Sequence, residues 1–217
     1  MKKIMTLLLV VALSLPVCAQ YDSNRKRSRY NHNDTERYYG LRLGLNIATL
    51  SSDAAMYDMN SRTGLAFGFV YGFQLANAAP IWLETGLLYS EKGGESKWLD
   101  PTTNKDQKVT CSLNYLQLPV VCKYAFEVAD DFFLQPFFGG YLSLGIAGKI
   151  KEYDTKESYS SYDSFGRFDG GLRVGCGVEY QMVYLEMGFD FGLANINKDD
   201  FDTAHTQNFF ITAGVNF

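Results

Sequence analysis

His205 is the residue best suited to acid–base chemistry, since the chain has only two histidines and His205 has hydroxyl and carboxylate neighbours. These neighbours are Thr203, Thr206, Asp199, Asp200 and Asp202. A Ser-His-acid type of hydrolase needs such a base within reach of a nucleophile. All of these residues fall in one polar segment, which we predict to be a loop with no rigid strand to orient them. An enzyme is therefore the less favoured class, and no catalytic residue is assigned.

Glu179 and Glu186 could form a pair of carboxylates for general acid–base catalysis. Arg42, Lys123 and Arg173 share their predicted face, so charge pairing is the commoner outcome. The acidic segment 197–202 lacks the glycine and the spacing of a calcium loop. No glycine pattern fits a phosphate-binding loop, and the cysteines and histidines lack zinc-ligand spacing. We therefore expect neither a metal site nor a cofactor.

Alternation of apolar with small or polar residues is the dominant pattern of the chain, and it predicts β-strands. It recurs in eight segments: 38–50, 64–78, 81–93, 114–126, 132–150, 168–180, 184–194 and 207–217. Long polar connections, at 51–62, 93–109, 151–166 and 195–207, alternate with short turns. This arrangement predicts an all-β fold, an eight-stranded antiparallel up-and-down transmembrane barrel. Ten strands remain possible if the second or third long loop contains a further hairpin.

The polar face of these strands holds most of the charged residues within them. They are Arg42, Glu84, Lys123, Asp169, Arg173, Glu179, Glu186 and Asp190, and parity adds Lys149. A water-soluble barrel such as a lipocalin would turn these charges outward and expose the glycines beside them for no evident reason. Inward-facing glycines instead make room for bulky side chains in a narrow lumen, and the apolar face then meets lipid. We therefore predict a network of paired charges in the lumen.

Residues 1–19 have the pattern of a secretory signal peptide, with two lysines, an apolar stretch and small residues at the end. Cleavage is predicted between Ala19 and Gln20. Residues 20–37 are expected to form a flexible periplasmic segment, and residues 38–217 to form the outer-membrane barrel domain. The mature chain has 18 basic and 24 acidic side chains, so nucleic acid is an unlikely partner. Cys111, Cys122 and Cys176 are expected to remain unpaired, because no bridging framework is implied.

Several segments carry a family resemblance: YYGLRLGLN, NYLQLPVVCKY, PFFGGYLSLG, FDGGLRVGCGVEY and a closing strand that ends at Phe217. Over residues 38–217 the chain resembles the PorT-like outer-membrane β-barrel proteins, a porin-like family. Phe217 is similar to the C-terminal aromatic that the barrel-assembly machinery recognises in such proteins. The resemblance implies a bacterial outer-membrane protein, and an even number of strands would place both ends of the barrel domain in the periplasm.

Eight strands leave an interior that side chains fill, which predicts a barrel that does not conduct large solutes. We therefore expect a structural or binding protein that acts through long extracellular loops; the alternative is a narrow channel for small solutes. Candidate recognition residues in the loops are Trp98, Tyr153, Tyr159 and Tyr162. Expected partners are outer-membrane lipid, the barrel-assembly machinery during insertion, and an unidentified surface ligand or envelope protein.

Overall fold

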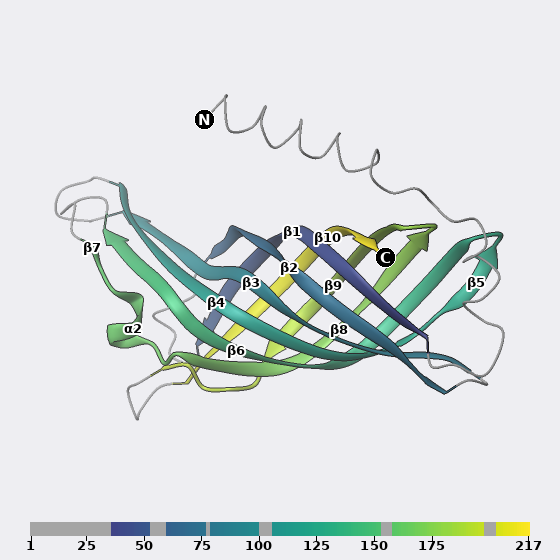
Figure 1. Cartoon of the computed structure of the whole chain (residues 1–217). Coiled ribbons are helices and arrows are strands. Elements are labelled where there is room, and N and C mark those ends of the chain that lie inside the picture. Colours follow the sequence, from purple (N-terminus) through teal and green to yellow (C-terminus); the bar gives the residue numbers. More distant parts are fainter. Residues whose placement is uncertain (1–35, 53–59, 77–78, 100–105, 153–157, 198–202) are drawn as a thin grey trace. The chain divides into compact units, whose positions relative to one another are not determined.

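The computed structural model describes residues 36–52, 60–76, 79–99, 106–152, 158–197 and 203–217. Residues 34–217 form one compact unit, and its described residues form antiparallel strands and one helical turn (Figure 1). The elements are β1 (Arg37–Ser52), β2 (Asn60–Ala76), β3 (Ala79–Leu99), β4 (Asp106–Tyr124), β5 (Phe126–Ala129), β6 (Phe132–Glu152), β7 (Ser158–Tyr159), α2 (Ser161–Ser164), β8 (Phe168–Tyr180), β9 (Val183–Gly192) and β10 (Ala204–Asn216). The predicted signal peptide, with its Ala19–Gln20 cleavage site, lies outside the described residues, as does nearly all of segment 20–37. In the part of the chain that the structure describes, no helix is both long and apolar enough to cross a membrane.

Eight long strands form a closed ring, which confirms the predicted fold. Each strand pairs antiparallel with the next, and β1 also pairs with β10 from Gly40↔Asn216 to Ser52↔Ala204. β4 pairs directly with β6, so the ring has no open edge. β5 follows β4 after Ala125 and pairs with the start of β6, whereas β7 only adds two residue pairs to β6. Neither short strand adds to the wall, so the ten-stranded alternative is not realised in the described residues.

The two ends of the barrel differ in their connections. At one end, Gln181–Met182 and Asp130–Asp131 form tight turns, in which Gln181 and Asp131 adopt positive φ angles of 57° and 61°. We call this the short-turn end. The end of β10 lies there, because Val215 pairs with Val183 beside the Gln181–Met182 turn, and the start of β1 lies there because Gly40 pairs with Asn216. The longer connections lie at the opposite end, where β7 and α2 are seen in Figure 1. We call that end the long-connection end.

The strands extend further than alternation predicts at the long-connection end. β3 continues past Gly93 to Leu99, and β4 begins at Asp106, so most of the predicted loop 93–109 is a paired hairpin. β10 begins at Ala204, which places His205 on a strand rather than in a loop. The prediction was wrong at these points because it relied on apolar alternation. A strand that leaves the apolar layer keeps its backbone hydrogen bonds but needs no apolar face.

The outward and inward faces follow the predicted parity within the apolar layer. Leu43 is 57% exposed, whereas its neighbour Arg42 is 4% exposed and lies inside the barrel. The same contrast recurs in β9, whose residues are alternately exposed and buried. Large exposed side chains such as Phe67, Leu142 and Phe189 cover the outer surface. A continuous apolar belt of this kind suits lipid and would be unfavourable against water.

Glycines on the inward face provide the space that bulky lumenal side chains occupy. A Cβ at Gly175 would lie 2.5 Å from the ring of Phe137, and one at Gly188 would lie 2.7 Å from the ring of Phe210. Gly175 and Gly188 are paired across β8 and β9. The two rings stack with their centroids 6.4 Å apart, so this glycine pair accommodates an aromatic pair in the narrow bore.

Replacing Leu43 with arginine tests whether the apolar belt meets lipid. We expect Leu43→Arg to lower the free energy of unfolding by about 2–4 kcal/mol, because a charge near the bilayer centre loses its hydration. Tyr39→Arg, at the start of the same strand, is the matched control and should cost about 0–1 kcal/mol, because it lies near the interface. The measurement is urea unfolding in phospholipid vesicles; equal small effects at both positions would contradict a lipid-facing belt.

Candidate functional site

The lumen contains the main concentration of charged side chains in the described barrel. Four cations and five carboxylates are buried there: Arg42, Lys92, Lys123, Arg173, Glu84, Asp169, Glu179, Glu186 and Asp190. All eight members of the predicted network lie among these nine. They are contributed by five strands, so closure of the barrel brings together residues that are distant in the sequence. We call this set the lumen network.

Glu84 on β3 accepts bonds from three side chains, which lie on two other strands. The Tyr38 hydroxyl donates at 2.6 Å, the Arg42 Nη2 atom at 3.1 Å and the Lys123 ammonium at 2.8 Å. Lys123 also donates to the Tyr184 hydroxyl at 2.7 Å. A carboxylate buried with this many donors has its lost hydration replaced by charge-assisted hydrogen bonds. Glu84 is therefore a structural crosslink between β1, β3 and β4.

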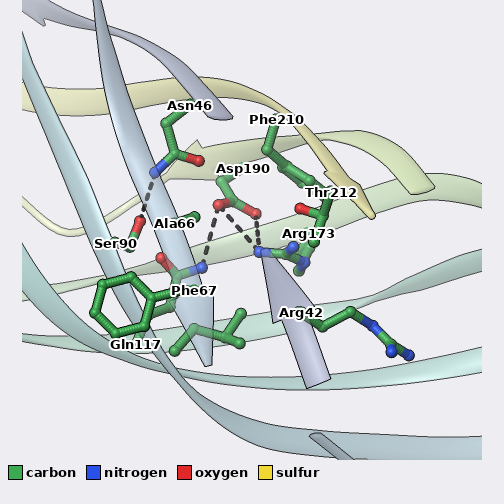
Figure 2. Close-up of a pocket in the computed structure, with 11 residues that line it drawn as sticks. Arg42, Asn46, Ala66, Phe67, Ser90, Gln117, Arg173, Asp190, Phe210 and Thr212 are labelled. Atoms are coloured by element: carbon green, nitrogen blue, oxygen red, sulfur yellow. Dashed lines mark hydrogen bonds and ion pairs between the residues drawn. The ribbon is translucent and has the colours of Figure 1, made fainter. Parts of the chain in front are cut away.

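Asp190 on β9 is the second crosslink and lies beside Arg173 and Gln117 at a small cavity (Figure 2). The Arg173 Nη1 atom donates to its two carboxylate oxygens at 3.1 and 3.2 Å, and the Gln117 amide donates at 3.1 Å. Arg173 also lies over the ring of Phe210, with its Cζ atom 3.7 Å from the ring centroid. The cavity drawn in Figure 2 has a volume of only about 10 Å³, which is room for about one water molecule.

Asp169 on β8 is the third crosslink and pairs with a residue that the sequence analysis did not assign. Lys92 donates to its Oδ2 atom at 3.1 Å, and Thr206 donates to the same atom at 2.8 Å. The Lys92 ammonium also lies 4.2 Å from the ring centroid of Tyr141. Parity alone could have identified Lys92, because Lys92 and Glu84 both occupy even-numbered positions of the same strand and therefore share its lumen face. It was missed because it stands beside the predicted loop at Gly93.

Glu179 lies nearer the short-turn end and accepts bonds from neutral amides. Gln135 donates at 3.1 Å and Asn216 donates at 2.8 Å to the same carboxylate oxygen. Asn216 in turn accepts a bond from the Arg42 Nη1 atom at 2.8 Å. Glu186 lies 3.7 Å from both Lys123 and Arg173, so it links the Glu84 and Asp190 clusters. The Glu84, Asp190 and Glu179 clusters are thus connected to one another.

A buried apolar cluster fills the lumen at the long-connection end. We call it the mouth cluster; its members are Leu50, Cys111, Leu113, Tyr115, Ile150, Tyr162, Ile196 and Ala204. The Tyr162 hydroxyl donates to the backbone carbonyl of Asn114 at 3.0 Å, and the Tyr162 ring meets the ring of Tyr115 edge-on. Ser161 donates to the carbonyl of Ser112 at 2.8 Å. The α2 turn is therefore fastened to β4.

The structure places the four candidate recognition residues differently from one another. Tyr162 is 4% exposed, so its prediction as a loop recognition residue was wrong: its ring packs inward over Gly145, where a Cβ would collide with it. Trp98 lies on β3 rather than in a loop, paired with Gln107 in the extended hairpin. Tyr159, on β7, is 43% exposed, whereas Tyr153 lies outside the described residues.

Lys149 also differs from its predicted position on the lumen face. The β4–β6 register shifts between Asn114 and Tyr115, where Ala147 and Gly145 are the respective partners. The extra residue in β6 reverses the parity beyond it, as a β-bulge does. Lys149 is therefore exposed beside Ser112, and Asp169 is neutralised by Lys92 instead.

A closed antiparallel barrel with an apolar outer surface and a charged interior is the architecture of a transmembrane β-barrel. The chain belongs to the outer membrane protein beta-barrel domain family, whose sequence model matches residues 18–198. It is thus a small eight-stranded barrel of the outer membrane. None of the curated proteins compared with the chain matches it.

Solved structures of three bacterial barrels are similar to this chain. Neisserial surface protein A has 17% sequence identity and a TM-score of 0.47, and the match covers 85% of this chain and 98% of that one. Ail, the attachment invasion locus protein of Yersinia pestis, has 12% identity and a TM-score of 0.44, covering 84% and 99%. OprG from Pseudomonas aeruginosa has 12% identity and a TM-score of 0.42, covering 85% and 98%.

Replacing Glu84 tests whether the lumen network stabilises the barrel. We expect Glu84→Gln to lower the free energy of unfolding by about 3 kcal/mol, because Arg42 and Lys123 lose a buried counter-charge. The double variant Glu84→Gln/Lys123→Gln should lose less unfolding free energy than the two single variants together, because each substitution removes the charge that the other would leave unpaired. Glu95→Gln is the matched control; the Glu95–Lys108 pair is partly exposed and should contribute about 0–1 kcal/mol. Additive effects in urea unfolding would show that the pair is uncoupled.

Labelling of Cys111 tests whether the α2 turn covers the mouth. Burial raises the pKa of the Cys111 thiol to about 11. At pH 8 only about one thiol in a thousand would then be thiolate, so maleimide should react very slowly in a Cys122→Ser/Cys176→Ser background. Tyr162→Ala should speed the labelling at least about tenfold by admitting water, which lowers that pKa.

Tyr159→Ala is the matched control for that experiment, since Tyr159 is an exposed tyrosine of the same segment. It should leave the labelling rate of Cys111 unchanged. Fast labelling of Cys111 in the protein with both tyrosines intact would contradict a covered mouth.

Proposed function

We propose that this protein is a non-conducting barrel of the outer membrane, which acts as a structural and binding protein through its long-connection end. The single observation that supports this proposal is the filling of the lumen. The cavity between Arg42, Gln117, Arg173 and Phe210 measures about 10 Å³, and the mouth cluster lies beyond it. Hydrated solutes need a continuous polar path, which crosslinked charges and an apolar cluster do not provide.

The proposal assigns recognition to the outside of the barrel rather than to its bore. β3, β4 and β6 are the longest strands, and they extend beyond the others at the long-connection end (Figure 1). Tyr159 is exposed in the same region. A rigid paired hairpin loses little entropy when it binds a partner. An envelope protein or another surface ligand is the partner that we propose, without catalysis.

The orientation and the assembly of the barrel are also parts of the proposal. We place the short-turn end in the periplasm, with both ends of the barrel domain, because outer-membrane barrels have short periplasmic turns. The Phe217 backbone pairs with Tyr39, and its side chain is exposed at the end of β10. It is thus accessible as the C-terminal aromatic signal for the assembly machinery. Within the outer membrane protein beta-barrel domain family, we also propose that the chain is a PorT-like protein.

Planar-bilayer recordings with the purified full-length protein test the proposal. We expect no stable conductance steps, because the lumen network and the mouth cluster block the bore. A triple variant, Tyr115→Ala/Tyr162→Ala/Phe210→Ala, should produce small steps, because it removes three buried rings from the lumen. The matched control truncates three lipid-facing side chains, Phe67→Ala/Leu142→Ala/Phe189→Ala, and should remain silent. Stable porin-like steps from the wild-type protein would overturn the proposal in favour of a channel.

A further inference from the structure

A second and larger cavity lies at the long-connection end, where β3, β4 and β6 extend. It is an open cleft of about 380 Å³, large enough for a small ligand group. Four cationic side chains line it, from Arg62, Lys108, Lys149 and Lys151, against the single carboxylate of Glu95. Thr110, Ser112 and Asn114 add neutral hydrogen-bonding groups. We call this cavity the basic cleft.

The basic cleft lies on the outward face of the wall. Directly paired residues of antiparallel strands share a face, and Ser112 pairs with Lys149 while Thr110 pairs with Lys151. Cys111 and Ile150, between them in sequence, point to the opposite face and are buried in the mouth cluster. The lysines are therefore separated from the lumen by the wall itself.

The cleft begins where the apolar belt ends. Leu144 and Ile146 on β6 are exposed apolar residues of the belt, and Lys149 follows on the same outer surface after the bulge. Three residues of strand span about 10 Å, so Lys149 is about that far beyond Ile146. This is the depth of lipid headgroups next to a hydrocarbon layer.

The charges of the cleft are only partly offset by the protein. Lys108 pairs with Glu95, with 2.6 Å between the ammonium and the carboxylate. Among the described residues, no carboxylate forms an ion pair with Arg62, Lys149 or Lys151; Arg62 donates instead to the carbonyl of Lys92 at 3.4 Å. Lys149 and Lys151 stand two residues apart on one face, so they repel each other unless an anion lies between them.

We propose that the basic cleft binds the phosphorylated headgroup of an outer-leaflet lipid, whose acyl chains lie against the apolar belt below it. Phosphate oxygens accept charge-assisted bonds from lysine and arginine, and basic pockets beside a hydrocarbon layer are suited to anionic headgroups. The position of the basic cleft favours a lipid over a soluble anion, because the cleft and the apolar belt form one continuous outer surface. The inference rests on the orientation proposed above but not on a non-conducting lumen.

Native mass spectrometry of the detergent-solubilised full-length protein tests the site, with diphosphorylated lipid A as the probe. We expect Lys149→Gln/Lys151→Gln to weaken binding about tenfold or more, because each lysine contributes a charge-assisted bond. Lys149→Arg/Lys151→Arg should bind within about threefold of the wild-type protein, since it keeps both charges. Arg37→Gln removes an exposed cation at the short-turn end and should leave binding unchanged.

Two further measurements separate the possible outcomes. Lipid A without its phosphates should bind as weakly to the wild-type protein as intact lipid A binds to the double glutamine variant. Inorganic pyrophosphate should neither bind measurably nor compete with lipid A. If it binds as tightly as lipid A and with the same dependence on Lys149 and Lys151, the cleft is a site for soluble anions and the lipid assignment is overturned. Equal binding of lipid A by the wild-type protein and the glutamine variant also overturns it. Heat-modifiable mobility in gels verifies that each variant is folded.

Discussion

Hydrogen bonding of the backbone inside lipid is the constraint on which this structure depends. The hydrocarbon layer offers no water, so each N–H and C=O of the wall needs a partner within the wall. β1 and β10 provide the last of these pairs, from Gly40↔Asn216 to Ser52↔Ala204, and Phe217 continues the pairing with Tyr39. Closure by eight strands fixes a narrow bore. The composition of the lumen and the position of any binding surface follow from that bore.

Charged residues in a narrow bore must neutralise one another, because little water can reach them. Glu84, Asp169 and Asp190 each join strands that are not neighbours in the ring, so the lumen network braces the wall from within. The same side chains occupy the space through which a solute would pass. Stability and conduction are therefore opposed in a barrel of this size, and surface is available for recognition only on the outside and at the ends.

Alternation predicted the faces well where lipid lies on one side and the lumen on the other. Arg42, Glu84 and Asp190 were placed correctly, because a period of two residues gives the face of each side chain without knowledge of its partner. The pattern failed where the strands leave the lipid. Thr206 was predicted to be in a loop, because a polar strand has no apolar face that would reveal it. Lys149 was predicted to face the lumen, because a β-bulge reverses parity without a signal in the sequence.

The sequence by itself determined the class of the protein and the chemistry of its two faces, because these depend on local alternation. The choice of eight wall strands over ten was made by the structure, in which β4 pairs directly with β6. Only the tertiary structure decided which charges pair, how Tyr162 covers the mouth and where the outer lysines gather. Arg42 and Asn216 are 174 residues apart, yet they lie 2.8 Å from each other. Their contact depends on the register across the closing strands. Register is a property of the whole ring, so no single segment of the sequence contains it.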